Sequence, residues 1–283
     1  MEYKQYVLGK QTLAQLEDSL LLSKPTLQKH FDSLKLTEFT PKPSSVHLVI
    51  DATYFGKKKD KDGVLIAKDS FTGRIVYYKF IESETTNQYQ LLRNHLESTG
   101  FTIVSVTIDG RLGVKSVFQD LPLQMCQFHL MQIVNRYLTK KPKLLPSKQL
   151  KTIVDSLPQS NQNSFKARFE YWLEVNSEFL NQKTFDPVTK RYHYTHKRLR
   201  SAVKSIQRNL PYVFTYQESN FTGIKQPEIL AQYLATKTKL NSRVEHTTNC
   251  LDGWFAHLRK LLNCHNGLRK DRKHKMIERI IRN

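Results

Sequence analysis

The stretch VHLVIDATYF, residues 46–55, decides the fold. Its β-branched and aromatic residues predict a strand, and the apolar run around one carboxylate, Asp51, predicts that this strand is buried. Turns that contain Gly lead into two further strands, residues 64–67 and 74–81. The three segments together predict a meander.

A helix and a fourth strand follow the meander. Tyr89, Leu92 and Leu96 recur at helical spacing, and residues 101–108 form an apolar run that leads straight into Asp109. Three strands, a helix and a fourth strand predict an α/β fold. After a short helix and an apolar segment, a longer helix carries one apolar face, made of Leu130, Ile133, Val134, Tyr137 and Leu138.

The segment before the first strand predicts two short helices, residues 11–17 and 20–31, joined by a tight turn. Ser23 is placed to cap the second helix, and Pro25 is tolerated in its first turn, where backbone N–H groups have no partner within the helix. Residues 38–45 contain two prolines and few apolar side chains. They predict a linker.

This helical pair resembles a DNA-binding helix-turn-helix, with residues 24–31 as the recognition helix. Two residues depart from that pattern, because Leu21 stands where the turn usually has Gly and Glu17 where a small residue usually packs. A plain helical hairpin that caps the next domain is the alternative. The resemblance implies three DNA contacts on the second helix: Lys24, Gln28 and Lys29.

Residues 147–244 show a helical pattern with loops and without clear strands. Within this region, residues 190–208 hold seven basic side chains and no acidic one. Aromatic rings among cations suit contact with unpaired or distorted DNA, and a solvated helix face is the alternative. The rings in question are Tyr192, His193, Tyr194 and His196, and the basic residues expected to contact DNA are Arg198, Arg200 and Lys204.

The clearest amphipathic helix begins near residue 249, and its apolar stripe consists of Leu251, Trp254, Phe255, Leu258, Leu261 and Leu262. Membership of this stripe favours a place in the core for Trp254 and Phe255 over stacking on bases. With Asn249 as N-cap, Asp252 falls at the third helical position, where an acid closes a capping box. Two turns further on the same face lies Arg259, which we expect to meet phosphate together with its neighbour Lys260.

The composition of the chain points to a polyanionic partner. Its 283 residues include 45 Lys plus Arg against 25 Asp plus Glu, a formal net charge of +20. Residues 1–138 carry a net charge of +3 and residues 139–283 a net charge of +17. We therefore expect the second half to make most of the contacts with the backbone of the nucleic acid. A hydrophobic fraction of 39% excludes wholesale disorder.

Several kinds of protein are excluded by the same inspection. No apolar run reaches the roughly 18 residues of a membrane span, and the first ten residues are too polar for a signal peptide. Three scattered cysteines do not make a disulfide framework. We therefore expect a soluble, cytoplasmic protein that associates with the nucleoid.

Two carboxylates stand where a charge is costly. Asp51 interrupts a buried strand, and Asp109 directly follows another. If the first and fourth strands are neighbours, the two carboxylates converge and would hold a divalent metal such as Mg²⁺, which prefers carboxylates, waters and phosphate oxygens. Asp252 would come from a later helix as the third carboxylate, in addition to any role at the helix start.

Several further segments carry a resemblance that spans nearly the whole chain in order. They are IDATY (50–54), DGRLG (109–113), QMCQFH (124–129), HKRLRSA (196–202), NLPY (209–212), TTN (247–249) and HNGL (265–268). With them the chain resembles DDE-type transposases of bacterial insertion sequences, in the branch related to eukaryotic Mutator-like elements.

The resemblance implies a ribonuclease H-like mixed sheet with an all-helical insertion. It divides the chain into a helix-turn-helix segment (1–37), a linker (38–45), the first part of the catalytic core (46–145), the helical insertion (146–245), and a last core helix with a basic tail (246–283). It also implies that Asp51 and Asp109 match the first and second catalytic and metal-binding carboxylates.

The third carboxylate departs from the pattern, because similar sequences have Glu where this chain has Asp252. Asp is one methylene shorter, so either the helix lies closer or the activity is reduced. Glu245 is the second choice, and we expect it in a loop. A second departure lies at the N-terminus, where similar proteins often carry a zinc-binding segment before the helix-turn-helix. We expect this chain to be a short or truncated version without that segment.

Cys126 and His129 match a Cys/His pair that similar transposases have after the second carboxylate. A structural or positioning role is the main interpretation. Zinc is the alternative, although two ligands do not complete a tetrahedral site and Cys264 with His265 would have to supply the rest.

The function implied by the resemblance is a DNA transposase. It would use Mg²⁺ or Mn²⁺ to hydrolyse a phosphodiester at an element end and to join the freed 3′-OH to target DNA. Its partners would be double-stranded DNA and a second copy of itself, as a homodimer or higher assembly, and no membrane. The alternatives are an inactive relative that binds DNA and a structure-selective nuclease. The tail expected to hold the DNA backbone contains Arg269, Lys270, Arg272, Lys273, Lys275, Arg279 and Arg282.

Overall fold

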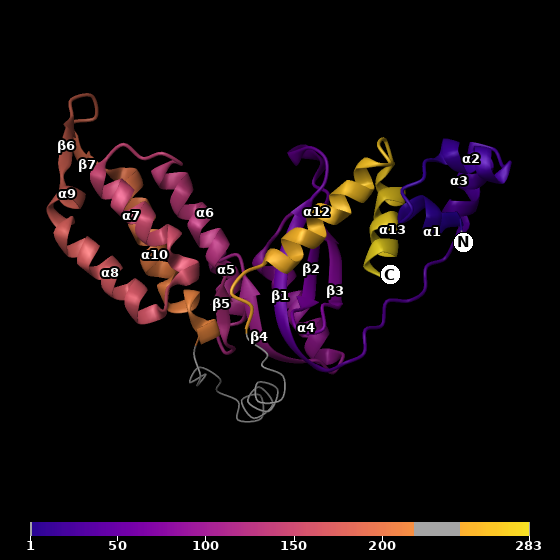
Figure 1. Ribbon diagram of the computed structural model, residues 1–283, viewed down its shortest axis with the longest axis horizontal. Helices are drawn as coiled ribbons and strands as arrows, with labels where there is room; N and C mark the ends of the chain where they lie inside the picture. The colour runs from indigo at the N-terminus through magenta and orange to yellow at the C-terminus, as the bar shows by residue number, and fades with distance from the viewer. Residues whose placement is uncertain (1, 218–243, 283) are drawn as a thin grey trace.

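The computed structural model describes residues 2–217 and 244–282, and its centre is a five-stranded mixed sheet (Figure 1). The strands are β1 (Ser45–Tyr54), β2 (Gly63–Asp69), β3 (Ile75–Ile81), β4 (Thr102–Ile108) and β5 (Leu123–Met125), in the order β3-β2-β1-β4-β5. β1 and β3 are antiparallel to β2, whereas β1, β4 and β5 run parallel. The predicted α/β class and the four predicted strands are confirmed.

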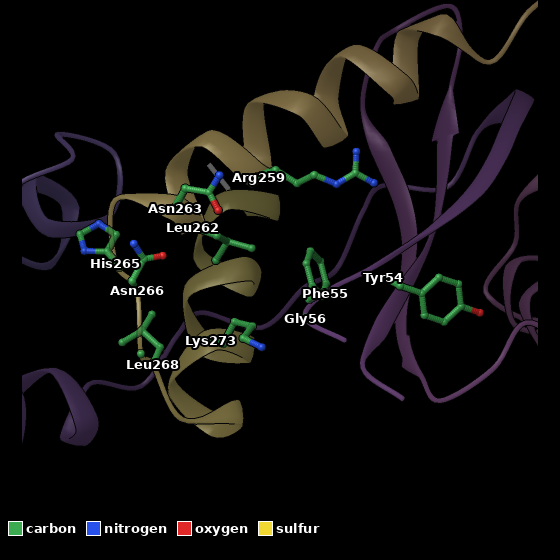
Figure 2. Close-up of a pocket in the computed structure, with 11 residues that line it drawn as sticks. Tyr54, Phe55, Gly56, Arg259, Leu262, Asn263, His265, Asn266, Leu268 and Lys273 are labelled. Atoms are coloured by element: carbon green, nitrogen blue, oxygen red, sulfur yellow. The ribbon is translucent and has the colours of Figure 1, made fainter. Parts of the chain in front are cut away.

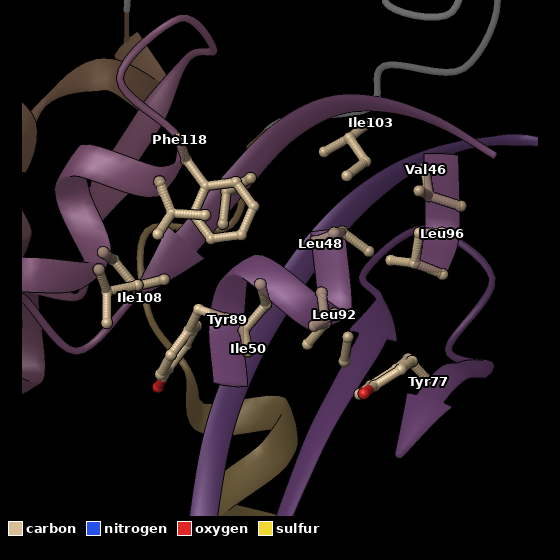
Figure 3. Close-up of a cluster of buried hydrophobic side chains, with 14 of the residues drawn as sticks. Val46, Leu48, Ile50, Tyr77, Tyr89, Leu92, Leu96, Ile103, Ile108 and Phe118 are labelled. Carbon is tan, nitrogen blue, oxygen red and sulfur yellow. The ribbon is translucent and has the colours of Figure 1, made fainter. Parts of the chain in front are cut away.

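Strand β1 is buried on both faces because its apolar residues alternate between two cores. Leu48 and Ile50 belong to one hydrophobic cluster, and Val49 belongs to another. Since successive side chains of a strand point to opposite faces, Asp51 shares the face of Val49. The first face is covered by α4 (Thr86–Ser98) and by Phe118, as Figure 3 shows.

The second face of the sheet is covered by the two ends of the chain. Helices α12 (Asn249–Asn263) and α13 (Lys270–Ile281) and the N-terminal helices α1 (Glu2–Val7), α2 (Leu13–Leu20) and α3 (Lys24–Ser33) share one cluster with β1 and β2. The predicted place of Phe255 in the core is confirmed at 2% exposure, and Trp254 packs against the same cluster. This layer is therefore built by contacts between residues that are far apart in the sequence.

The two predicted N-terminal helices are confirmed as α2 and α3, and α1 precedes them without having been predicted. The Ser23 hydroxyl accepts a hydrogen bond from the backbone N–H of Thr26 at 3.4 Å, as expected of an N-cap. Leu21 ends α2 with a left-handed backbone, φ +56°. The predicted linker contains no helix or strand before β1 begins at Ser45.

A helical region follows β5. It consists of α6 (Gln127–Leu138), α7 (Leu145–Asp155), α8 (Gln162–Val175), α9 (Ser177–Asn181) and α10 (Lys197–Val213), which pack around a third cluster. Short 3-10 turns lie at Lys58–Asp60, Leu157–Gln159 and Thr215–Gln217, and α5 (Leu112–Val117) precedes β5. The part of the predicted helical pattern that falls within residues 218–243 lies outside the described residues.

The prediction that this region contains no strands is wrong. Residues 183–194 form a hairpin of β6 (Lys183–Asp186) and β7 (Arg191–Tyr194). The Asp186 carboxylate accepts a hydrogen bond from the backbone N–H of Val188 at 2.9 Å, and this closes the turn. Four residues a strand are too few for a pattern of period two to stand out, so only the Asp-Pro turn signalled the hairpin.

Among the described residues, no helix combines the length and the apolar character that a membrane crossing requires.

Candidate active site

Asp51 lies on β1, and Asp109 directly follows β4, the parallel neighbour of β1. Val49 of β1 pairs with Thr107 of β4, so each carboxylate comes two residues after a paired position. The Asp51 carboxylate accepts a hydrogen bond from the N–H of Ala52 at 2.8 Å, and that of Asp109 accepts one from the N–H of Arg111 at 3.1 Å. The two predicted catalytic carboxylates therefore reach the same end of the central strand pair.

Asp252 lies in the first turn of α12, which packs on the same face of β1. The predicted helix start is wrong by one residue, because Thr248 and not Asn249 is the N-cap. Asp252 is then the fourth helical residue, and the predicted capping box does not form. Its carboxylate lies 3.4 Å from the Thr248 hydroxyl instead.

Electrostatic interactions link the three carboxylates. Burial raises the pKa of Asp51 to about 7, and the negative charges of Asp109 and Asp252 add to the rise. The Ala52 N–H and the charge of His129 act in the opposite direction. The fold thus brings Asp51, Asp109 and Asp252 into electrostatic reach of one another.

Cys126 and His129 join this group through Thr248. The backbone N–H of Thr248 donates to Cys126 Sγ at 3.3 Å, and its hydroxyl lies 3.3 Å from His129 Nδ1. Burial disfavours a Cys126 thiolate, but hydrogen bonds from His129 and Thr248 outweigh it and lower the pKa of the thiol. The bond to Cys126 raises the pKa of His129 to about 9, and Asp51 and Asp109 contribute. These interactions favour the protonated form of His129.

Sequence reasoning missed Glu84, which precedes α4. Its carboxylate accepts a hydrogen bond from the hydroxyl of Tyr89 and forms an ion pair with Arg111 at 2.9 Å. Burial raises the pKa of Glu84, and the charge of Asp109 also raises it. The signal that identified Asp109, a carboxylate directly after a strand, would have pointed to the exposed Glu82 after β3, so nothing local singled out Glu84.

Arg259 lies two turns after Asp252 on α12, and its guanidinium donates to the Thr53 hydroxyl of β1. It also lines a cleft of about 410 Å³ between the end of β1, the end of α12 and α13 (Figure 2). Asn263, Asn266 and Lys273 contribute polar groups to the walls of this cleft. The adjoining Lys260 is exposed.

The other side chains predicted to contact DNA differ in whether they already bond to groups within the protein. Lys24 forms an ion pair with Glu17 at 3.3 Å, and the Gln28 side chain bonds Asp32 at 3.4 Å. Arg198 and Arg200 donate to the carbonyl oxygens of Arg136 and Leu180. Exposed side chains remain at Lys29 and Lys204.

Much of the basic tail is engaged within the molecule. Arg272 forms an ion pair with Asp32 of α3 at 2.6 Å, and Lys273 forms one with buried Asp62 at 3.0 Å. Lys275 donates to the carbonyl oxygen of Phe31 at 2.6 Å. These side chains tie α13 to the N-terminal helices and to the sheet.

The donor chemistry of the three carboxylates is the set of oxygen ligands that Mg²⁺ prefers. As they stand, however, the described residues include no group of three or more His, Cys, Asp or Glu that is close enough to hold a metal ion.

Glu245, the second choice for the third carboxylate, lies in a loop, as predicted. Its backbone carbonyl accepts a hydrogen bond from the Thr107 hydroxyl at 2.7 Å.

The four-ligand zinc alternative is excluded by α12. Cys126 lies against the start of this helix and Cys264 at its end. The helix has 15 residues, which span about 22 Å at 1.5 Å per residue. Cys126 with His129 and Cys264 with His265 therefore cannot share an ion.

Neither a protein-family model nor a curated protein matches this chain.

Proposed function

We propose that this chain is a DNA transposase with a ribonuclease H-like catalytic core, in which Asp51, Asp109 and Asp252 bind Mg²⁺ or Mn²⁺. The observation that carries the proposal is the position of two carboxylates in the sheet order. With the order β3-β2-β1-β4-β5, Asp51 lies on the central strand and Asp109 directly after its parallel neighbour. This agrees with the fold that the sequence resemblance implies.

The surroundings of the carboxylates support phosphodiester chemistry. When bound, a divalent ion stabilises the entering and leaving oxygens of a displacement at phosphorus. His129, whose protonated form is favoured, and Arg259, which lies on the same helix as Asp252, would hold phosphate oxygens by charge and hydrogen bonds. Cys126 and Thr248 keep His129 charged and in place, which is a positioning role.

The proposed reaction has two displacements. Water attacks a phosphodiester at the element end, the P–O3′ bond breaks, and a 3′-OH is released. That 3′-OH then attacks a phosphodiester of the target DNA, where a new P–O3′ bond forms while the target's own P–O3′ bond breaks and its 3′-OH leaves. Both the attacking and the leaving groups belong to DNA or water, so no covalent bond to the protein forms. Two ends must be brought together, which implies double-stranded DNA as substrate and a dimer or larger assembly.

One observation favours a second candidate, an inactive relative that binds DNA without cutting it. Asp252 is one methylene shorter than the Glu of similar sequences, and the described carboxylates do not close into a three-ligand group. Binding would then persist while hydrolysis is lost.

The test is a nicking and strand-transfer assay with labelled duplexes that carry the terminal repeats flanking the gene, in Mg²⁺ or Mn²⁺. We expect wild type to nick and join DNA, and Asp109→Ala to lose at least 100-fold in rate, on the order of the effect of removing a charge-stabilising group. Glu170→Ala is the matched control, because that carboxylate is exposed on α8.

Asp252→Glu separates the candidates. Binding without nicking in wild type, with nicking restored by Asp252→Glu, contradicts an active transposase and supports the inactive relative. Nicking without joining in both proteins indicates a nuclease.

A further inference from the structure

The β6–β7 hairpin extends from one end of the helical region, away from the sheet (Figure 1). In its register Phe185 pairs with Tyr192 and Lys183 with Tyr194. Alternation along each strand places these four side chains on one face. The Phe185 and Tyr192 rings lie 5.1 Å apart and are 49% and 71% exposed. The hairpin therefore presents an aromatic face to solvent.

This face is held in a fixed conformation. Asp186 binds the turn through Val188 N–H and through the Thr189 hydroxyl, at 2.9 and 2.8 Å. At the other end the Arg200 guanidinium lies 3.5 Å from the centre of the Tyr194 ring. An isolated two-stranded hairpin is marginally stable in water, so this anchoring keeps the aromatic pair presented to a partner.

The charge around the hairpin identifies the chemistry of that partner. Residues 183–208 contain eight basic side chains and one acid, Asp186, whose carboxylate is used in the turn. A second copy of the same surface would be repelled. A partner with negative backbone charges and flat apolar faces fits both properties, and unpaired or unstacked nucleic-acid bases have them.

We propose that the β6–β7 hairpin is a stacking platform for unpaired DNA bases, on which Phe185 and Tyr192 contact base faces while nearby basic side chains hold the backbone. The proposal rests on DNA being the substrate, as in the proposed function. It gives a structural form to the expectation that aromatic rings among cations contact unpaired DNA, and it adds Phe185 to those rings. His196 plays no part in the platform, because it stacks on Phe179 at 3.7 Å.

The experiment measures DNA binding of the full chain in EDTA, where no cutting occurs. One fluorescent duplex carries a ten-nucleotide single-stranded tail, and a second duplex of the same sequence is blunt. We expect wild type to bind the tailed DNA more tightly. The double variant Phe185→Ala/Tyr192→Ala should lose roughly tenfold or more on the tailed DNA and less than about twofold on the blunt one.

Two further variants control for exposure and for chemistry. Tyr171→Ala removes a ring of matching exposure, 70%, from α8 and should leave both affinities unchanged. Tyr192→Phe keeps the ring and should bind tailed DNA like wild type. Circular dichroism melting checks that each variant is folded.

Three outcomes overturn the proposal. They are equal binding of tailed DNA by wild type and double variant, equal losses on both DNAs, and a free-protein dimer that the double variant abolishes. If wild type binds neither DNA, the proposed function fails as well. Loss of nicking with the tail preference intact affects the proposed function alone.

Discussion

At the scale of single residues, Asp51 is a position where the surroundings disfavour the charged form of the side chain. Its carboxylate lies on a strand between two cores, and burial together with Asp109 and Asp252 raises its pKa to about 7. A charged Asp51 therefore lowers the stability of the folded chain. Such a residue is retained where its charge serves a function, as metal binding would.

We expect Asp51→Asn to stabilise the protein in a pH-dependent way. The folded pKa, about 7, exceeds the unfolded value near 4, so the penalty is absent below pH 4, grows between pH 4 and 7, and is complete above pH 7. At pH 8 the variant should be more stable by roughly 2–4 kcal/mol. Urea denaturation of both proteins in EDTA across this range measures the difference.

Metal provides the control for this prediction. Added Mg²⁺ or Mn²⁺ should stabilise wild type at pH 8 and leave Asp51→Asn nearly unchanged, because ions that bind only the folded state add stability. A stability difference that is independent of pH would contradict the assignment of Asp51 as a half-buried carboxylate with a raised pKa.

His129 shows how neighbouring residues fix a charge. Cys126 is fully buried, yet its thiol shares a hydrogen-bond network with His129 and with Thr248, the residue that begins α12. A positive charge on His129 lowers the pKa of Asp51. The pair that the sequence suggested for a positioning role therefore has a physical means of exerting one.

At the scale of elements, α12 connects the candidate site to the core. Leu251, Phe255 and Leu258 are buried in the cluster that includes residues of the sheet. Arg259 donates to Thr53 of β1, and the charge of Asp252 acts on Asp51. One amphipathic helix thus positions both Asp252, the proposed third carboxylate, and Arg259, the cation proposed to bind phosphate. Displacement of its start at Thr248 would move Asp252 and His129 together.

The end of α2 offers a test of a local backbone requirement. Leu21 has φ +56° and its side chain is 90% exposed, so it has left-handed strain and little packing to offset it. Leu21→Gly should raise the free energy of unfolding by about 0.5–1 kcal/mol. Leu22→Gly is the matched control, and it should lower stability because Leu22 does not have a positive φ. Urea denaturation of wild type and the two variants measures the free energies of unfolding. A lower stability of Leu21→Gly would show that the turn does not need Gly.

At the scale of the whole molecule, the ends of the chain close one core over the sheet. Tyr6, Leu27 and Phe31 of the N-terminal helices lie in the same cluster as Ile277 of α13. Ion pairs from Arg272 and Lys273 reinforce this junction. Many tail cations are therefore used in folding, and the exposed cations of the second half lie mainly in the helical region.

We expect DNA affinity to depend on salt most through that helical region. Lys197 and Lys204 are exposed on α10, whereas Lys24 is partly neutralised by Glu17. Lys197→Ala/Lys204→Ala should reduce the slope of log K against log salt by about two, since each phosphate contact contributes roughly 0.9. Fluorescence anisotropy titrations at salt concentrations between about 50 and 300 mM measure this slope.

The comparison variant is Lys24→Ala/Lys29→Ala on α3, which should change the slope by less. A larger loss from the α3 pair would reverse the expected division of labour between the two halves of the chain.

The sequence by itself determined the features that depend on neighbouring residues. Apolar, β-branched runs in residues 46–55 and 101–108 specified two strands, Asp51 and Asp109 were identified by their place in or directly after those strands, and Ser23 marked a helix start. These signals are local, because side-chain period and capping hydrogen bonds involve residues a few positions apart.

Only the tertiary structure decided the rest. It set β1 beside β4, brought Asp252 and His129 to Asp51, added Glu84, and turned residues 183–194 into a hairpin. It also paired Arg272 with Asp32, 240 residues away, so a tail that looked free for DNA is bound to the protein itself. Such contacts depend on which surfaces pack together, and no local pattern in the sequence specifies that choice.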